Sequence, residues 1–245
     1  MTTAALLIIG DEILTGKVVD ENSPWLITQL REMGVEIRCV MVVPDAVDLI
    51  ADHLRALCVQ VDYVFTSGGL GPTHDDRTME AVGLAVGQAL APNADLTGLV
   101  RSWLEGKPGS AWRLAAMERM CLVPTGAVLH RKGDRSFPLV TVENIIVLPG
   151  VPHLLRKKFE LFRSQFDDDV GPPSLGLRLE STFDETEFAV QLAAIQERWA
   201  DIGIGSYPRR TADGWVTTIT LDGRDRDRLE ACASEIRAML CELES

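Results

Sequence analysis

The chain has 245 residues, an apolar content of 46%, a charged content of 24% and a net charge of −12. This composition is typical of a soluble globular protein, and the acidic charge excludes nucleic acid or an anionic membrane as partner unless a local basic patch exists, which the sequence does not show. The five cysteines are scattered without a CxxC pair, which excludes a disulfide framework or a zinc site and indicates a reduced, cytoplasmic protein.

Strands and helices are predicted to alternate along the first two thirds of the chain. The opening strand is a continuous apolar run that ends at Gly10, as is typical of a strand buried on both faces of a parallel sheet. Four such strands are expected, over residues 4–9, 35–43, 61–65 and 144–148. A helical pattern follows each of them, and the first helix is predicted to begin at Ser23 as its N-cap. This order predicts a mostly parallel sheet covered by helices on both faces.

A domain boundary is predicted near residue 170. Residues 167–175, DDDVGPPSL, have the acid, glycine and proline content of a linker. We therefore expect an α/β domain over residues 1–166 and a small α+β domain over residues 176–245. The elements of the second domain are predicted in the order βαββα.

Four loops share one feature, because each begins where a predicted buried strand ends. They are GDEILTG, VPD, SGGLGPTHDD and PGVP. Ligands of open α/β sheets bind beyond the carboxyl ends of the strands, so we expect these loops to line one pocket. The candidate ligand-binding residues are Gly10, Asp11, Glu12, Thr66, Ser67, Gly68, Gly69, Gly71, Thr73, His74, Pro149 and Gly150.

The glycine-rich loop is neither of the two familiar phosphate loops. It lacks the lysine of a Walker A motif, and His74 stands where a dinucleotide motif has its third glycine. Gly68, Gly69 and Gly71 nevertheless allow the backbone to approach a phosphate, and the following helix offers free N–H groups. The sequence therefore predicts phosphate binding by the backbone alone.

Two aspartates at the end of this loop, Asp75 and Asp76, would repel a phosphate unless a divalent cation lies between them. Mg²⁺ commonly takes one or two carboxylates together with phosphate oxygens. We therefore expect Mg²⁺ or another divalent metal, held by Asp45, Asp75 and Asp76, with Asp11 and Glu12 nearby.

Ordinary structural roles are the alternative for these residues. Aspartate and threonine near a helix start are commonly caps, and THDD matches a capping box that would make Asp75 and Asp76 caps only. Asp45 after Pro44 is likewise a plausible N-cap. Asp11 and Glu12 fit solvated turn positions, and a single loop histidine such as His74 is commonly a bystander.

Four stretches, IIGDEILTGKVVDENSPWL, VVPDAVDLI, FTSGGLGPTHDDRTMEAV and VLPGVP, resemble the amino-terminal domain of the CinA (competence/damage-inducible) family. That domain belongs with the MoaB, MogA and gephyrin domains to the molybdopterin-binding group. The resemblance covers about residues 4–165, and residues 176–245 are more weakly similar to the small domain that follows in CinA. It implies a three-layer α/β/α fold and a homo-oligomer, either a dimer or a trimer.

The resemblance also implies a chemistry. In the molybdopterin adenylyltransferases, aspartates at the positions of Asp45 and Asp76 support Mg²⁺-dependent reactions on a phosphate-bearing pterin. CinA-type domains are instead associated with metal-dependent hydrolysis of ADP-ribose. We therefore expect Asp45 and Asp76 to be catalytic in pyrophosphate hydrolysis of a small phosphorylated ligand, a nucleotide or a pterin. The alternatives are a non-catalytic carrier of pterin or nucleotide, adenylyl transfer in molybdenum-cofactor biosynthesis, and a scaffold with a relic pocket.

Two segments depart from the family pattern. HRKGDRSFP, residues 130–138, replaces an N-P-x-G-T-A-P-G stretch, and Leu154 stands where the family has a glutamate. Loss of that carboxylate weakens metal binding, whereas Arg131, Lys132 and Arg135 offer cations to a phosphate.

Overall fold

The computed structural model describes residues 2–131, 133, 136–166, 173–212 and 214–243. The chain divides into two compact units, residues 1–171 and residues 172–245, and each is described here by itself. The division lies inside the segment predicted as a linker, of which residues 167–172 lie outside the described residues.

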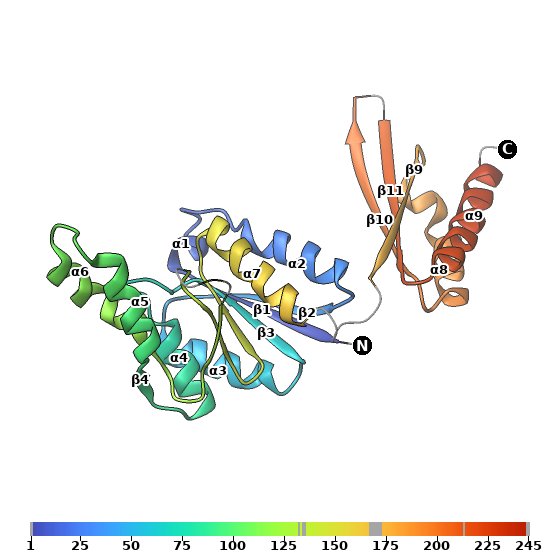
Figure 1. The fold of residues 1–245 in the computed structure, drawn as a ribbon. Coiled ribbons are helices and arrows are strands. Elements are labelled where there is room, and N and C mark those ends of the chain that lie inside the picture. Colours follow the sequence, from blue (N-terminus) through green and yellow to red (C-terminus); the bar gives the residue numbers. More distant parts are fainter. Residues whose placement is uncertain (1, 132, 134–135, 167–172, 213, 244–245) are drawn as a thin grey trace. The chain divides into compact units, whose positions relative to one another are not determined.

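The first unit is built on a six-stranded sheet with the order β2-β1-β3-β8-β7-β6 (Figure 1). Four neighbouring strands are parallel, namely β2 (Glu36–Val43), β1 (Thr3–Ile9), β3 (Tyr63–Ser67) and β8 (Ile145–Leu148). The sheet continues with the antiparallel pairs that β7 (Leu139–Val142) forms with β8 and with β6 (Val128–His130). The mostly parallel sheet predicted from the sequence is confirmed.

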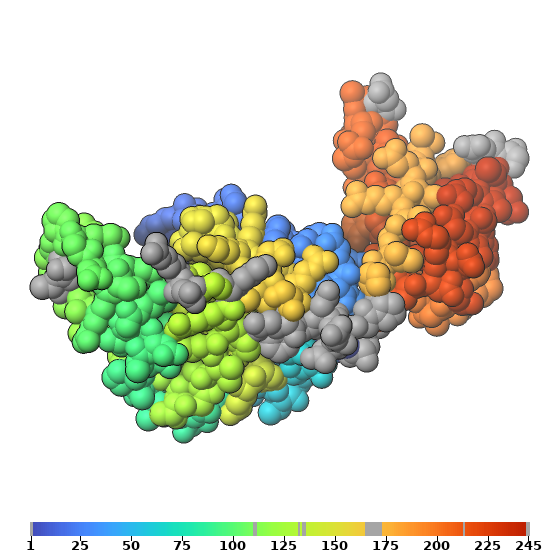
Figure 2. Space-filling view, in the orientation of Figure 1, coloured from blue at the N-terminus to red at the C-terminus, as the bar shows by residue number. Residues whose placement is uncertain are grey.

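Helices cover both faces of this sheet (Figure 1 and Figure 2). On one face lie α2 (Asn22–Glu32) and α7 (Pro152–Phe166), and on the other lie α3 (Val47–Cys58) and α4 (Thr78–Val86). Alternate residues of β1 belong to different cores: Leu6 packs with the α2 and α7 side, and Leu7 packs with the α3 and α4 side. Both are fully buried, which is why the strand reads as a continuous apolar run.

Several short elements were not predicted. They are α1 (Asp11–Leu14), β4 (Leu90–Pro92), β5 (Leu122–Pro124), β6, β7 and the 3₁₀ turn at Glu118–Cys121. β4 and β5 form a separate two-stranded sheet that contacts α4. In the chain, α5 (Ala94–Leu104) and α6 (Ser110–Met117) lie between these two strands. Three or four residues are too few to show an apolar period, so only tertiary pairing reveals such strands.

The second unit has the βαββα order that the sequence predicts. Its elements are β9 (Leu175–Ser181), α8 (Glu185–Arg198), β10 (Gly203–Thr211), β11 (Gly214–Gly223) and α9 (Arg226–Leu243). The strands form an antiparallel sheet in the order β10-β11-β9, and both helices share one core with it through residues such as Phe188, Ile219 and Ile236. None of the helices in the described residues is both long and apolar enough to cross a membrane.

Candidate functional site

The four motif loops begin at one edge of the sheet. Ile9 pairs with Val43 across β1 and β2, and Ser67 pairs with Leu148 across β3 and β8. Backbone hydrogen bonds continue the pairing past the strand ends: the Gly10 N–H donates to the Val43 carbonyl at 3.1 Å, and the Gly68 N–H donates to the Leu148 carbonyl at 3.3 Å. The loops after β1, β2, β3 and β8 are therefore neighbours.

Two glycines allow three of these loops to pack backbone against backbone. Gly68 has a φ of +113°, and a Cβ placed on it would lie 2.0 Å from the carbonyl oxygen of Ile9. A Cβ on Gly150 would lie 3.2 Å from the Cα of Gly68. The loop junction thus leaves no room for a side chain at Gly68.

A buried asparagine ties the start of α2 to this junction. The Asn22 Nδ2 donates to the Ser67 Oγ at 3.0 Å and to the Gly150 carbonyl at 2.7 Å. The nearby Asp20 accepts hydrogen bonds from the backbone N–H groups of Asn22 (2.9 Å) and Ser23 (3.0 Å), two of the free N–H groups in the first turn of the helix. The prediction of Ser23 as the N-cap is wrong, because Ser23 already lies in the helix. Sequence reasoning also missed Asn22, although it lies inside the first family-like stretch.

Strand residues Thr66 and Ser67 are buried at the end of β3. Ser67 accepts the bond from Asn22, whereas the Thr66 hydroxyl has no hydrogen-bond partner in the described part of the chain. Both side chains are therefore buried, and neither lines the cavity described below.

Hydrogen bonds join the two ends of the glycine loop and also hold its middle part. Thr78 begins α4, and its hydroxyl donates to the Gly68 carbonyl at 2.9 Å. Asp76 accepts the Thr73 N–H at 2.9 Å and also the Thr73 hydroxyl. The Thr73 hydroxyl lies 2.5 Å from Asp75 as well, and this hydrogen bond lowers the pKa of Asp75. α4 has no side-chain cap, so the interpretation of Asp75 and Asp76 as helix caps is wrong.

Asp45 reaches across to the neighbouring loop. Its Oδ2 accepts the backbone N–H of Asp11 at 3.0 Å, and α3 begins two residues later without a side-chain cap, so the N-cap alternative for Asp45 is also wrong. Burial raises the pKa of Asp45, the hydrogen bond from Asp11 opposes this, and the charges of Asp11, Glu12 and Asp75 raise it further. Carboxylates from three loops therefore repel one another here.

The remaining predicted residues lie around this cluster. Asp11 and Glu12 form the first turn of α1, and the Glu12 carboxylate packs against Gly10, where an added Cβ would lie 2.6 Å from its Oε1. The His74 side chain is 95% exposed, with its Nδ1 3.9 Å from Asp75 Oδ1. Arg131 lies 3.8 Å from Asp95, and Lys132 and Arg135 lie outside the described residues.

The carboxylates around the glycine loop could hold a hard cation such as Mg²⁺ only if a bound ligand contributed further oxygens. Within the described residues, no three His, Cys, Asp or Glu side chains converge on one point as a metal site. Mg²⁺ typically needs only one or two carboxylates when phosphate oxygens complete its coordination, and a cation beside Asp45 would offset the repulsion that raises its pKa. A metal at these carboxylates would therefore need oxygens from a bound ligand.

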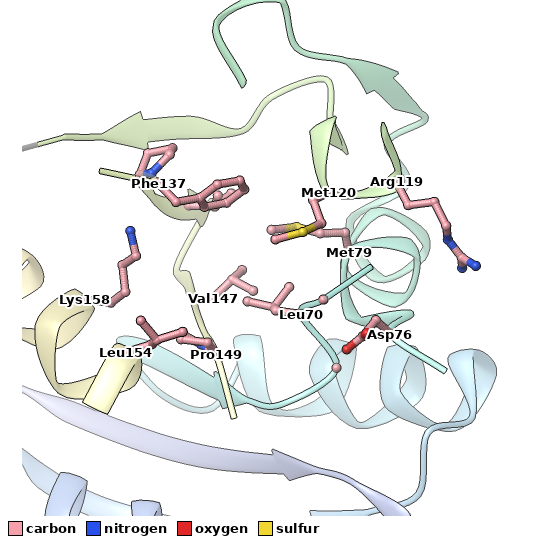
Figure 3. Close-up of a pocket in the computed structure, with 14 residues that line it drawn as sticks. Leu70, Asp76, Met79, Arg119, Met120, Phe137, Val147, Pro149, Leu154 and Lys158 are labelled. Carbon is pink, nitrogen blue, oxygen red and sulfur yellow. The ribbon is translucent and has the colours of Figure 1, made fainter. Parts of the chain in front are cut away.

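A cavity of about 140 Å³ lies beside the glycine loop (Figure 3). Its apolar walls include Leu70, Met79, Met120, Phe137, Val147 and Leu154. Gly69, Gly71 and Pro149 also line it, and its charged residues are Asp76, Arg119 and Lys158. Sequence reasoning found the loop residues but missed Phe137 and Lys158, because Phe137 lies in the segment that departs from the family pattern and Lys158 lies in a helix without a motif.

The fold and the loop arrangement define an α/β/α domain of the MoaB/MogA type. Residues 5–167 match the family described as "probable molybdopterin binding domain", and the chain belongs to that family. Residues 174–244 match the "FAD synthase, middle domain".

The similar proteins have two kinds of name, FAD synthase and CinA-like protein. The chain is 32% identical to "Probable FAD synthase" of Caenorhabditis elegans, over 97% of this chain and 50% of that protein, and 33% identical to a "CinA-like protein" of Frankia casuarinae, over 93% and 55%. It thus spans about half the length of each. The crystal structure of CinA from Thermoplasma acidophilum is similar with a TM-score of 0.58 and 27% identity, over 67% of this chain and 98% of that one. The resemblance to the CinA amino-terminal domain is confirmed.

Proposed function

We propose that the first domain binds a nucleotide or pterin phosphoanhydride at the strand ends and hydrolyses it with a divalent metal, with ADP-ribose as the expected type of substrate. The observation that carries this proposal is the position of Asp45. Its carboxylate is partly buried, accepts the N–H of Asp11 in the neighbouring loop and lies near like charges from two other loops, those of Asp11 and Glu12 and of Asp75. Such an arrangement is costly for a merely structural residue and is typical of a functional site.

Each part of the junction has a role in this proposal. Gly69 and Gly71 line the cavity, so N–H groups of this loop can donate to phosphate oxygens there. Asp45 and Asp76 supply carboxylate oxygens for the cation, and Thr73 fixes the orientation of Asp76. A divalent metal bound there would offset phosphate charge and lower the pKa of a bound water. Asn22 holds the surrounding loops in register.

The reaction balances as a simple hydrolysis. Water adds to one phosphorus of the anhydride, the bridging oxygen leaves with the other phosphate, and ADP-ribose yields AMP and ribose phosphate. A second candidate is adenylyl transfer, in which a phosphate group rather than water is the acceptor. The relatives named FAD synthase favour testing it, although this chain spans only about half of their length.

The test is incubation of the purified chain with ADP-ribose or FAD and with Mg²⁺, Mn²⁺ or Co²⁺, followed by assay for AMP. Asp45→Asn and Asp76→Asn are expected to lose about 100-fold or more of the activity, in line with the loss of a key electrostatic group. Asp48→Asn, an exposed aspartate in the first turn of α3, is the matched control. Unchanged turnover in Asp76→Asn would refute its role, and ligand binding without product in any metal would favour a carrier.

The protein is also proposed to be a cytoplasmic homo-oligomer, as the family resemblance implies. Sedimentation of the purified chain over a range of concentrations would give the number of subunits, and a monomer at all concentrations would contradict this part of the proposal.

A further inference from the structure

The strand β2 forms one edge of the six-stranded sheet, and within the described residues it pairs with β1 alone. It has eight residues, whereas β6 at the opposite edge has three. An edge strand presents a row of free N–H and C=O groups to other chains, and proteins commonly protect it by short length, charged side chains or proline. Residues 39–43 of β2, CVMVV, contain neither a charge nor a proline.

A backbone hydrogen bond shows which residues of this segment face outward. The Val43 carbonyl accepts the Gly10 N–H at 3.1 Å, so the polar backbone groups of Val43 are directed toward β1. The N–H and C=O of one strand residue point to the same side, and that side alternates along the strand. Met41 therefore also faces β1, whereas Val40 and Val42 direct their N–H and C=O groups away from the sheet.

The side chains of the two outward residues are exposed as well. Val40 is 41% exposed and Val42 is 38% exposed. Cys39 and Met41 lie on the other face of the strand, where they are half-buried against the core on the α3 and α4 side. The helix α1 contacts β2 and adds the exposed side chain of Leu14. The open edge of β2 thus combines free backbone groups with apolar side chains, a combination typical of a surface that another strand covers.

The same segment of a second copy complements this edge. In an antiparallel arrangement about a two-fold axis at Met41, Val40 of one copy faces Val42 of the other, and the two Met41 residues face each other. Each valine pair would exchange two N–H···O=C bonds, because both of its residues face outward. Neighbouring two-fold registers are poorer. An axis at Val40 would set Arg38 opposite a valine, and an axis at Val42 would set Pro44 there.

Charge also favours a second copy in this register. The chain carries a net charge of −12, so two copies repel each other unless their contact is uncharged or joins opposite charges. Residues 39–43 are uncharged, and beyond them Arg38 of one copy lies opposite Pro44 of the other, about 5 Å away and next to Asp45. Arg38 is 57% exposed, and its ion pair with Glu36 lies on the surface. Its charge would offset part of the repulsion among the carboxylates around Asp45.

We propose that two copies of the chain associate through β2, with residues 39–43 paired antiparallel about a two-fold axis at Met41, so that the sheets of the two first domains join into one. The inference deepens the proposed function and rests on it for the presence of a homo-oligomer. It selects a dimer over a trimer, because a two-fold contact of one edge strand with itself is closed after two copies. It also brings Arg38 of each copy toward the carboxylates of the other.

Cross-linking of the full chain tests the register. The Cα atoms of a non-hydrogen-bonded antiparallel pair lie about 4.5 Å apart, inside the range of about 4.4–6.8 Å that a disulfide needs. Met41→Cys, in a chain whose exposed Cys241 is changed to serine, should therefore form a covalent dimer on mild oxidation, seen on a non-reducing gel. Val59→Cys, at an 85% exposed valine just after α3, is the matched control in the same background and should stay mostly monomeric on the gel. Met41→Cys that cross-links no better than Val59→Cys would overturn the proposal.

Sedimentation equilibrium tests the surface with a second variant. Val40→Lys places a charge in each copy beside the two-fold axis, as proteins commonly do to keep an edge strand free, and should weaken the dimer by about 10-fold or more. Val59→Lys makes the same change outside β2 and should alter the dimer constant by less than about twofold. Circular dichroism checks that both variants fold. A dimer that Val40→Lys leaves intact, a trimer, or a wild-type monomer at all concentrations would overturn the proposal.

Metal-dependent hydrolysis of ADP-ribose reports on the proposed chemistry separately. A Met41→Cys dimer that forms in a chain without hydrolytic activity would support the interface and count against the chemistry. Hydrolysis by a chain that fails both the cross-linking and the sedimentation tests would do the reverse.

Discussion

The Asp45 carboxylate accepts a hydrogen bond from the backbone N–H of Asp11 at 3.0 Å, which joins the loop after β2 to the loop after β1. The same carboxylate feels the charge of Asp75 in the glycine loop. Three segments that are far apart in the sequence therefore meet at one ionisable group, the carboxyl of Asp45. The geometry explains both the raised pKa of Asp45 and the expectation that a cation binds beside it.

Asp45→Asn should raise the melting temperature at pH 7 by a few degrees. The folded-state pKa of Asp45 lies above its unfolded value of 3.8, mainly through burial. The pKa shift of Asp45 therefore stabilises the native state fully below pH 3.8. This contribution to the free energy of unfolding is lost as the pH rises through the folded-state pKa. Asparagine keeps an acceptor for the Asp11 N–H but carries no charge. Thermal unfolding of both proteins from pH 3 to pH 7 checks this, and a less stable variant at pH 7 would show that the hydrogen bond outweighs the repulsion.

Gly68→Ala should cost at least about 2 kcal/mol of unfolding free energy, because the new Cβ would meet the Ile9 carbonyl and because φ is +113°. Gly98→Ala is the matched control, since Gly98 lies inside α5 and a Cβ there meets nothing within 4 Å. It should stabilise the protein by about 0.5–1 kcal/mol. Urea unfolding measures both, and similar values for the two variants would contradict the close packing of the loops.

Asn22→Ala should destabilise the first unit by about 1–3 kcal/mol, because the Ser67 hydroxyl and the Gly150 carbonyl lose their buried donor. Gln29→Ala, which removes an exposed hydrogen bond to Glu32 on the same helix, should change stability by less than about 0.5 kcal/mol. Denaturant unfolding distinguishes the two. If Asn22→Ala were as mild as Gln29→Ala, Asn22 would not hold the loop junction.

Lys158→Met should stabilise the ligand-free protein at pH 7 by about 1 kcal/mol, after allowance for the partial exposure of Lys158. The folded-state pKa of Lys158 is about 8, below the ordinary 10.5. Between these two pH values the unfolded chain binds more protons than the folded one, so the stability of the wild-type protein increases as the pH rises. The methionine variant should lack that gain. Melting temperatures from pH 7 to pH 10.5 provide the check, and a variant less stable at pH 7 would indicate a structural role.

The four parallel strands, their alternation with helices and the shared edge of the four loops follow from local sequence, whereas the short strands β4 to β7 do not. The buried apolar run before Gly10 predicts a strand of a parallel sheet. The loop after such a strand lies at the carboxyl end of the sheet, where ligands bind. The role of Asn22 and the position of Lys158 over Phe137 do not follow, because each depends on groups that meet only after folding. The cap interpretation of Asp45 is wrong because its carboxylate accepts the N–H of Asp11 in another loop. That of Asp76 is wrong because its partner, the Thr73 N–H, lies in the loop before α4 rather than in the helix.

Binding of Mn²⁺, followed by electron paramagnetic resonance with and without ADP-ribose, tests the central claim most directly, because Asp45 and Asp76 need phosphate oxygens to complete a metal site. We predict weak Mn²⁺ binding to the protein alone, binding at least 10-fold tighter than to either the protein or the nucleotide alone when both are present, and loss of this gain in Asp45→Asn and Asp76→Asn. Mn²⁺ affinity that is the same with and without the nucleotide, or that survives both substitutions, would contradict a metal shared between these carboxylates and a phosphate.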